Sequence, residues 1–340
     1  MNVNAFLNTV TNAHRTLPLV ILYVTEGCNM QCTMCSYRDP LPNELALAEI
    51  ETLATDLVSH GLRHIVYSGG EPLLRRDFDR ICAAFHALGV RQSLLTNGLL
   101  LEKRADLAGC FEEIIVSLDG PTAKVHDTIR RTNAFGQILR GISRVRQTAH
   151  PPTMSIRTVV QKANYRHLPE MVHFARSLGV GRISFLAADV LSSAFGRGTV
   201  SSPDPALMLS EEEATDFRAI VERMTNMFRE DFDSHFIAES PSKMFHLVQY
   251  FEALLGKSSF PLNRCNAPMV SAVITSTGDV HPCFFLPSLG NLRHENASGI
   301  LESPQAGMVR KDVRQYRLDR CKTCVCTLHV SPGRALFDRF

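Results

Sequence analysis

Three cysteines fall within one short stretch, Cys28-Asn29-Met30-Gln31-Cys32-Thr33-Met34-Cys35. A four-iron cluster is completed by four thiolates, so a loop that offers three leaves one iron open to another ligand. Open metal positions are where metal sites carry out chemistry. Zinc is the alternative, although its common pattern is paired Cys-x2-Cys units rather than a triplet with this spacing.

The chain around this stretch alternates β-prone apolar runs with helical patterns, beginning at Leu19. Strands are predicted over 20–24, 64–67, 93–96, 114–118, 155–160 and 183–186, with helices over 44–60, after 77, near 103, and over 138–147 and 168–178. This alternation predicts parallel strands joined by right-handed crossovers. The best fit is an α/β fold with a partial (β/α)6 TIM-like barrel, and a doubly wound sheet is the alternative. The three cysteines then follow the first strand, at the carboxyl end where side chains for chemistry gather.

Four segments are expected along the chain. Residues 1–18 form an N-terminal extension, 19–188 the partial barrel, 189–262 a helical bridge and 263–340 a small C-terminal domain. In the bridge, Ser210 with Glu213 three residues later is a capping box that predicts the start of a helix. In the last segment, 270–275 and 279–281 read as a β-hairpin.

Composition excludes several classes of protein. Hydrophobic residues make up 45% of the 340 residues and the net charge is +2, which suits a globular chain with a full core. No long run of like charge suggests nucleic-acid binding, and no run of roughly 18 apolar residues suggests a membrane span. Without a signal peptide the protein is expected to be cytoplasmic, where ten cysteines serve metals better than disulfides.

A second motif, Ser68-Gly69-Gly70-Glu71-Pro72, follows the second predicted strand. Its glycines let the backbone approach a ligand closely, and its carboxylate suits an ammonium group. Together with the cysteine triplet one strand earlier, this motif resembles the radical S-adenosylmethionine (SAM) superfamily over roughly residues 18 to 187.

The resemblance implies that a [4Fe-4S] cluster held by Cys28, Cys32 and Cys35 binds SAM at its open iron and cleaves it to a 5′-deoxyadenosyl radical. It also implies a flavodoxin-type or ferredoxin-type reductant. Met34 departs from the family, in which this position is often aromatic. Arg157 could touch SAM or the substrate, or form an ion pair instead. The cofactor-binding residues implied by the resemblance are Gly69, Gly70, Glu71, Pro72, Thr96, Asn97, Ser117 and Asp119.

The tail carries a second group of cysteines. Seventeen residues separate Cys265 from Cys283, and Cys321 and Cys324 form a Cys-x2-Cys pair. This spacing resembles the twitch domain, the short form of the SPASM domain, and implies one auxiliary [4Fe-4S] cluster. A structural zinc site is the alternative, because either metal accepts four thiolates. The expected ligands are Cys265, Cys283, Cys321 and Cys324, with Cys326 able to replace Cys324 or to stay free.

These features predict an oxidoreductase that abstracts hydrogen from an unactivated carbon, with the auxiliary cluster accepting an electron. The expected substrate is a small polar metabolite, such as an aminocyclitol or a sugar. Cross-linking or epimerisation of a ribosomal peptide is the alternative, and a non-catalytic iron–sulfur or zinc scaffold is the alternative of another class. The sequence identifies neither the general base nor the hydrogen that is removed.

Overall fold

The computed structural model describes residues 1–11, 14–197 and 202–337. Residues 12–13, 198–201 and 338–340, which belong to the predicted extension, bridge and C-terminal domain, lie outside the described residues. The described chain forms one nine-stranded sheet in the order β6-β5-β4-β3-β2-β1-β7-β8-β9. The strands are β1 (Leu19–Thr25), β2 (His64–Gly69), β3 (Arg91–Thr96), β4 (Glu113–Ser117), β5 (Thr153–Val160), β6 (Arg182–Ala187), β7 (Ser271–Ile274), β8 (Asp279–His281) and β9 (Gly290–Asn291).

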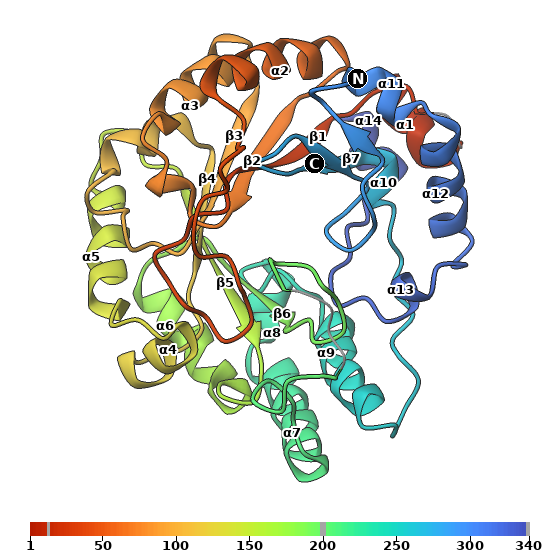
Figure 1. Ribbon diagram of the computed structural model, residues 1–340. Coiled ribbons are helices and arrows are strands. Elements are labelled where there is room, and N and C mark those ends of the chain that lie inside the picture. Colours follow the sequence, from red (N-terminus) through yellow and green to blue (C-terminus); the bar gives the residue numbers. More distant parts are fainter. Residues whose placement is uncertain (12–13, 198–201, 338–340) are drawn as a thin grey trace.

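Strands β1 to β6 are parallel neighbours in chain order, as predicted. Figure 1 shows them in an open arc with the connecting helices on its outer side and the cysteine loop on its inner side. A doubly wound sheet would carry helices on both faces, so the partial barrel is confirmed. The connecting helices are α2 (Leu47–Ser59), α3 (Phe78–Ala87), α4 (Ala123–Arg130), α5 (Phe135–Arg146) and α6 (Leu168–Ser177), with short 3-10 turns η1 (Pro72–Leu74), η2 (Ala105–Cys110) and η3 (Tyr165–His167).

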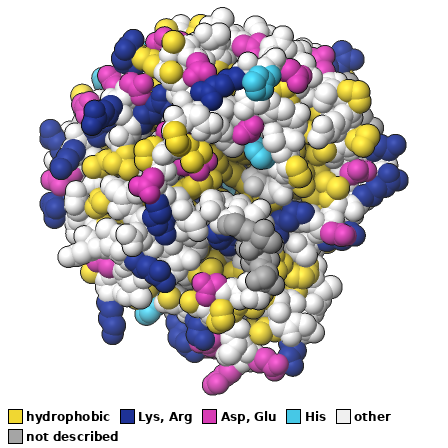
Figure 2. Space-filling model, in the orientation of Figure 1, with side chains coloured by type: hydrophobic (Ala, Val, Ile, Leu, Met, Phe, Trp, Pro, Cys, Tyr) yellow, Lys and Arg dark blue, Asp and Glu magenta, His cyan; other side chains and the backbone are white. Residues whose placement is uncertain are grey.

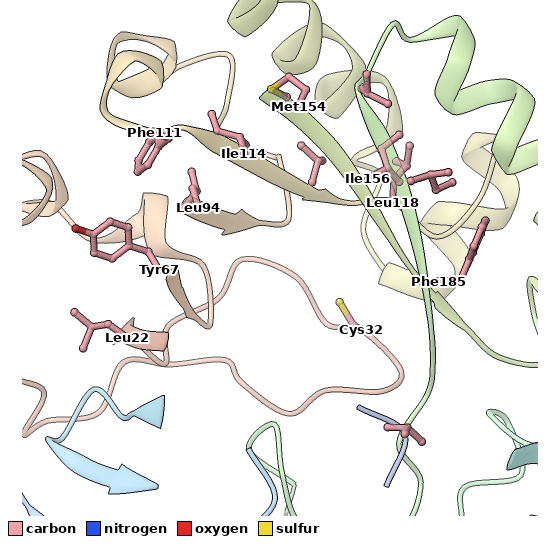
Figure 3. Packing of buried hydrophobic residues seen from close by; sticks show 14 of the residues in the cluster. Leu22, Cys32, Tyr67, Leu94, Phe111, Ile114, Leu118, Met154, Ile156 and Phe185 are labelled. Carbon is pink, nitrogen blue, oxygen red and sulfur yellow. The ribbon is translucent and has the colours of Figure 1, made fainter. Parts of the chain in front are cut away.

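The outer face of the sheet is packed by side chains that alternate along each strand. Figure 3 shows Tyr67 and Leu94 on this side, with Cys32 on the loop across the inner face. Tyr67 is fully buried, and its ring meets Phe78 edge-on with 5.0 Å between centroids. Its hydroxyl donates to Gln92 Oε1 at 2.6 Å. Because side chains alternate between faces, the residue that follows each outward-facing core residue points towards the cysteine loop.

The bridge contains the predicted helix with its capping box, since Ser210 Oγ accepts from Glu213 N at 3.2 Å and Glu213 Oε2 accepts from Ser210 N at 2.9 Å. Its helices are α7 (Glu211–Met227), α8 (Arg229–Asp233) and α9 (Pro241–Leu254). None of the helices in the described part of the chain is long and apolar enough to cross a membrane.

The C-terminal segment continues the barrel sheet. Strand β7 pairs parallel with β1, from Leu19 opposite Ser271 to Leu22 opposite Ile274, and β8 then pairs antiparallel with β7. The predicted hairpin is thus correct, but the sequence did not predict its attachment to the first strand. This segment also contains helices that were not predicted: α10 (Ala267–Val270), α11 (Ala297–Leu301), α12 (Pro304–Arg314), α13 (Asp319–Lys322) and α14 (Pro332–Leu336).

The N-terminal extension contains a further unpredicted helix, α1 (Val3–Val10), which packs on the C-terminal segment. Asn8 Nδ2 donates to Met269 O at 2.9 Å, and Ala5 is buried in a small cluster with Val330 and Ala335. Helices α1 and α14, one near each end of the chain, therefore lie together beside β7 (Figure 1). The exact boundaries of the four predicted segments stay predictions.

Candidate functional site

A cavity of about 210 Å³ lies between the inner face of the sheet and the cysteine loop. Figure 2, in the orientation of Figure 1, shows that the surface is hollowed near its centre, with hydrophobic side chains at the rim. Each strand from β2 to β6 contributes the side chain next to its outward-facing core residue. These inward residues are Ser68, Leu95, Ser117, Arg157 and Leu186.

All three cysteines of the loop line this cavity. The loop is held in place by main-chain hydrogen bonds: Gln31 N donates to Arg130 O at 3.3 Å, and Thr33 N donates to Ile129 O at 3.1 Å. These hydrogen bonds attach the loop to the last turn of α4.

The surroundings of the thiols suit a negatively charged cluster. Arg130 Nη1 donates to Cys32 Sγ at 3.6 Å, and Asn97 Nδ2 donates to Cys28 Sγ at 3.8 Å. Burial raises the pKa of the Cys28 thiol to about 11, so iron has to displace a proton when it binds there. Sulfur donor atoms, a buried cation and an adjoining cavity together fit a [4Fe-4S] cluster with one open iron.

Arg130 is the part of this site that the sequence analysis missed. Its Nε lies 2.7 Å from Asp119 Oδ2, and the two side chains are only 10% and 0% exposed. Asp119 Oδ1 also accepts from Val159 N at 2.8 Å. Asp119 was predicted to bind the cofactor, but it does not line the cavity. It lies behind the cavity and orients Arg130, which faces Cys32.

The two glycines after β2 line the cavity and also pack closely against the backbone that leads into the cysteine loop. A Cβ on Gly70 would lie 2.2 Å from the carbonyl oxygen of Gly27, and Gly69 has a φ of 109°. Only glycine can bring the strand end this close to the loop. Gly70 N donates to Thr25 O at 2.8 Å and secures the contact.

Glu71 lies in a different place from the one predicted. It is fully buried outside the cavity lining, and both of its oxygens are occupied. Oε1 accepts from Thr96 Oγ1 at 2.8 Å and from Leu73 N at 3.1 Å, while Oε2 accepts from Asn97 N at 2.7 Å. Burial raises the pKa of Glu71 to about 7, although these hydrogen bonds act to lower it. Glu71 thus positions the end of β3, and Pro72 beside it begins η1.

Thr96, Asn97 and Ser117 line the cavity, as does Met34 at the position that departs from the family. Asn97 Nδ2 also donates to Asn29 Oδ1 at 2.8 Å, which ties the third strand end to the cysteine loop. Arg157 lines the cavity from β5, and its Nε donates to Ser184 Oγ at 3.1 Å.

The C-terminal cysteines line a second cavity of about 80 Å³. Cys326 faces both cavities, together with Phe284 and Phe285. Cys324 Sγ donates to Cys326 O at 2.8 Å, so Cys324 and Cys326 meet at one side of this second cavity. Five thiols are available for four iron positions: Cys265, Cys283, Cys321, Cys324 and Cys326.

An ion cluster, also missed from the sequence, stands between the two cavities. Asp189 follows β6, lines the first cavity and is 5% exposed. Its carboxylate forms ion pairs with Arg197 and with Arg320. Nη2 of Arg320, the residue before Cys321, lies 2.6 Å from Asp189 Oδ1. Burial alone would raise the pKa of Asp189, but the hydrogen bond from Ser192 and the two arginines lower it. Asp189 is therefore an anchor rather than a proton acceptor.

Comparison with known proteins gives two family matches. Residues 22–175 match the model of the radical SAM superfamily, and residues 265–325 match the SPASM model, described as an iron-sulfur cluster-binding domain. These segments contain both groups of cysteines except Cys326. The match to an iron–sulfur domain favours iron over the zinc alternative at the tail.

Similar proteins are named as enzymes. The chain is 34% identical to a GTP 3′,8-cyclase of Marinobacter nauticus over 62% of its length and 63% of the cyclase, less than two thirds of that relative. It is 27% identical to an AdoMet-dependent heme synthase of Methanosarcina barkeri over 93% of its length and 89% of the synthase.

The solved structure of anSMEcpe with bound AdoMet shares the fold, with a TM-score of 0.64, 19% identity and coverage of 96% of both chains. The family matches, the shared fold and the geometry of the two cysteine-lined cavities agree. The chain belongs to the radical SAM superfamily and is an enzyme that uses a [4Fe-4S] cluster with SAM and carries a SPASM iron–sulfur domain.

Proposed function

We propose that the enzyme oxidises a small molecule bound in the cavity above the cysteine loop, with Cys28, Cys32 and Cys35 holding the SAM-binding cluster. The chemistry that this cluster and SAM supply together is a 5′-deoxyadenosyl radical, which takes a hydrogen atom from a substrate carbon. The auxiliary cluster, when bound, would supply an acceptor for the electron that the substrate loses, and the accompanying proton would pass to solvent. SAM is consumed in this scheme, and a flavodoxin-type or ferredoxin-type protein supplies the starting electron.

The roles of the cavity residues follow from their positions. The backbone at Gly69 and Gly70 leaves room for the methionyl end of SAM, and Thr96, Asn97 and Ser117 offer hydrogen-bonding groups along the same wall. Arg130 supplies a buried positive charge beside Cys32. Glu71 and Asp119 support these groups from behind and are assigned no direct contact with SAM.

The observation that carries the net oxidation is the wall between the two cavities. Phe284, Phe285 and Cys326 line both, so a single layer of side chains separates the substrate space from the auxiliary site. A substrate radical in the first cavity would have an electron acceptor directly behind this layer. The proposed auxiliary ligands are Cys265, Cys283, Cys321 and Cys324, with Cys326 as the alternative to Cys324.

The aminocyclitol-like or sugar-like substrate remains a prediction, and so does the peptide alternative. The cavity supports a second small-molecule class, an acid with a larger apolar body. Its lining is largely apolar, with Phe195, Phe284 and Phe285, while Arg157 offers a cation for a carboxylate. The heme synthase, which aligns over most of this chain, is named for an apolar tetrapyrrole, and we include tetrapyrrole carboxylic acids in this class.

The first test is anaerobic reconstitution with iron and sulfide, followed by dithionite and SAM, with 5′-deoxyadenosine measured by mass spectrometry. About eight irons per chain are expected from two four-iron clusters. The Cys32→Ala variant should form no 5′-deoxyadenosine, and intact clusters without SAM cleavage would contradict the proposal. Sugar-like and tetrapyrrole substrates are then compared by the mass lost from each, with the Arg157→Lys variant as a charge-retaining control for Arg157→Gln.

A further inference from the structure

Arg320 lies in the wall between the two cavities and contacts two other segments of the chain. Its Nη2 lies 2.6 Å from Asp189 Oδ1, and its guanidinium carbon stands 4.5 Å from the centre of the Phe285 ring. It precedes Cys321 in the chain and lines the auxiliary cavity. Arg320 therefore touches the barrel, the shared wall and the auxiliary site at once.

One donor of this guanidinium has no acceptor. Arg320 Nε is buried and makes no hydrogen bond within the described part of the chain. An unpaired buried N–H is costly because it has lost its hydrogen bond to water, so this group is expected to meet an acceptor when the cofactor is bound. The auxiliary cavity, which Arg320 lines beside five thiols, would supply sulfur acceptors once a cluster is bound.

The charge around Asp189 points the same way. One carboxylate is shared by two arginines, Arg197 and Arg320, so the ion cluster keeps a net positive charge next to the auxiliary site. A positive charge and an N–H directed at sulfur both favour the reduced, more negative form of an iron–sulfur cluster, and so raise its reduction potential.

We propose that Arg320 is a positioning residue for electron transfer: it donates its Nε–H to the auxiliary cluster, raises that cluster's potential, and through Asp189 and Phe285 fixes the wall towards the substrate. This inference rests on the proposed function, because it assigns the auxiliary cluster as the electron acceptor. It adds a determinant of how well that cluster accepts the electron.

The experiment is a redox titration of the reconstituted holoenzyme, with the auxiliary cluster followed by electron paramagnetic resonance. In Arg320→Gln the equilibrium constant for reduction of this cluster should fall about tenfold, a shift of about 59 mV for one electron. The matched control, Arg197→Gln, removes the same charge from Asp189 but no donor that lines the auxiliary cavity, and it should lower the constant less than Arg320→Gln does. A change below threefold in Arg320→Gln with full iron content would overturn the proposal.

If Arg320→Gln does not assemble the auxiliary cluster, Arg320→Lys decides the question, because it keeps the charge but lacks the Nε–H. A potential equal to the wild-type value in Arg320→Lys would rule out the hydrogen bond, whereas a lowered potential would support it. The proposed function fails by a different result: wild-type yield of oxidised product in Cys283→Ala, which should lack the auxiliary cluster.

Discussion

Removing one partner of the buried ion pair between Asp119 and Arg130 should strongly destabilise the barrel. Asp119→Asn keeps an oxygen to accept from Val159 N but places an amide against the guanidinium. Removing one partner of a buried pair leaves an uncompensated charge, which costs about 3–5 kcal/mol. Because the side chains are 0% and 10% exposed, little solvent is available to reduce this cost.

The matched control is Glu102→Gln, which breaks the ion pair with Arg140 on the surface. There the side chains are 42% and 62% exposed, and the expected cost is about 0–1 kcal/mol. Both variants are compared with wild type in anaerobic urea titrations of the reconstituted enzyme, followed by far-ultraviolet circular dichroism. Equal midpoints for the two variants, with unchanged slopes, would refute the argument from burial.

Three further predictions concern the glycines, the buried glutamate and the tail cysteines. Gly70→Ala should lose the SAM cluster, measured as about four fewer irons per chain, because its methyl group would collide with backbone of the cysteine loop. The control Gly109→Ala, with open space around it, should keep its full iron content. Equal iron content in the two variants would contradict this prediction. Burial raises the pKa of Glu71 from 4.5 to about 7, so the protonated carboxyl stabilises the folded protein fully below about pH 4.5. As the pH rises to 7, the free energy of unfolding should fall by about 3 kcal/mol. Glu71→Gln should lack this pH dependence in thermal melts from pH 4.5 to 8. Cys324→Ala should lose the auxiliary cluster in iron and EPR analyses while Cys326→Ala keeps it, and the reverse pattern would make Cys326 the ligand.

The sequence was sufficient to predict the order of the six parallel barrel strands and to place the ends of each strand to within two residues. The strands over 20–24 and 155–160 fall within β1 and β5, because alternating apolar runs and short connections leave few other parallel arrangements. The three cysteines also line one cavity, as their position after the first strand predicted. Spacing along a chain determines such local features.

Side-chain direction and long-range pairing could not be predicted in the same way. Glu71 is absent from the cavity lining, and its carboxylate is occupied by three donors from η1 and the end of β3. No pattern in the sequence records those donors. The Asp189–Arg320 contact joins residues 131 positions apart. The pairing of β7 with β1 had one visible signal, the uninterrupted run Ser271–Ile274, since a strand buried on both faces lacks alternation.

The pairing of β7 with β1 has a consequence for folding during translation. The first strand of the barrel leaves the ribosome about 250 residues before the strand that covers its outer edge. At about 5–20 residues per second, this interval lasts roughly 12–50 s. Throughout synthesis the Leu19–Thr25 edge is open to wrong pairing, and the N-terminal helix has no surface to rest on. Nascent chains of this enzyme should therefore depend on chaperones until β7 has been translated.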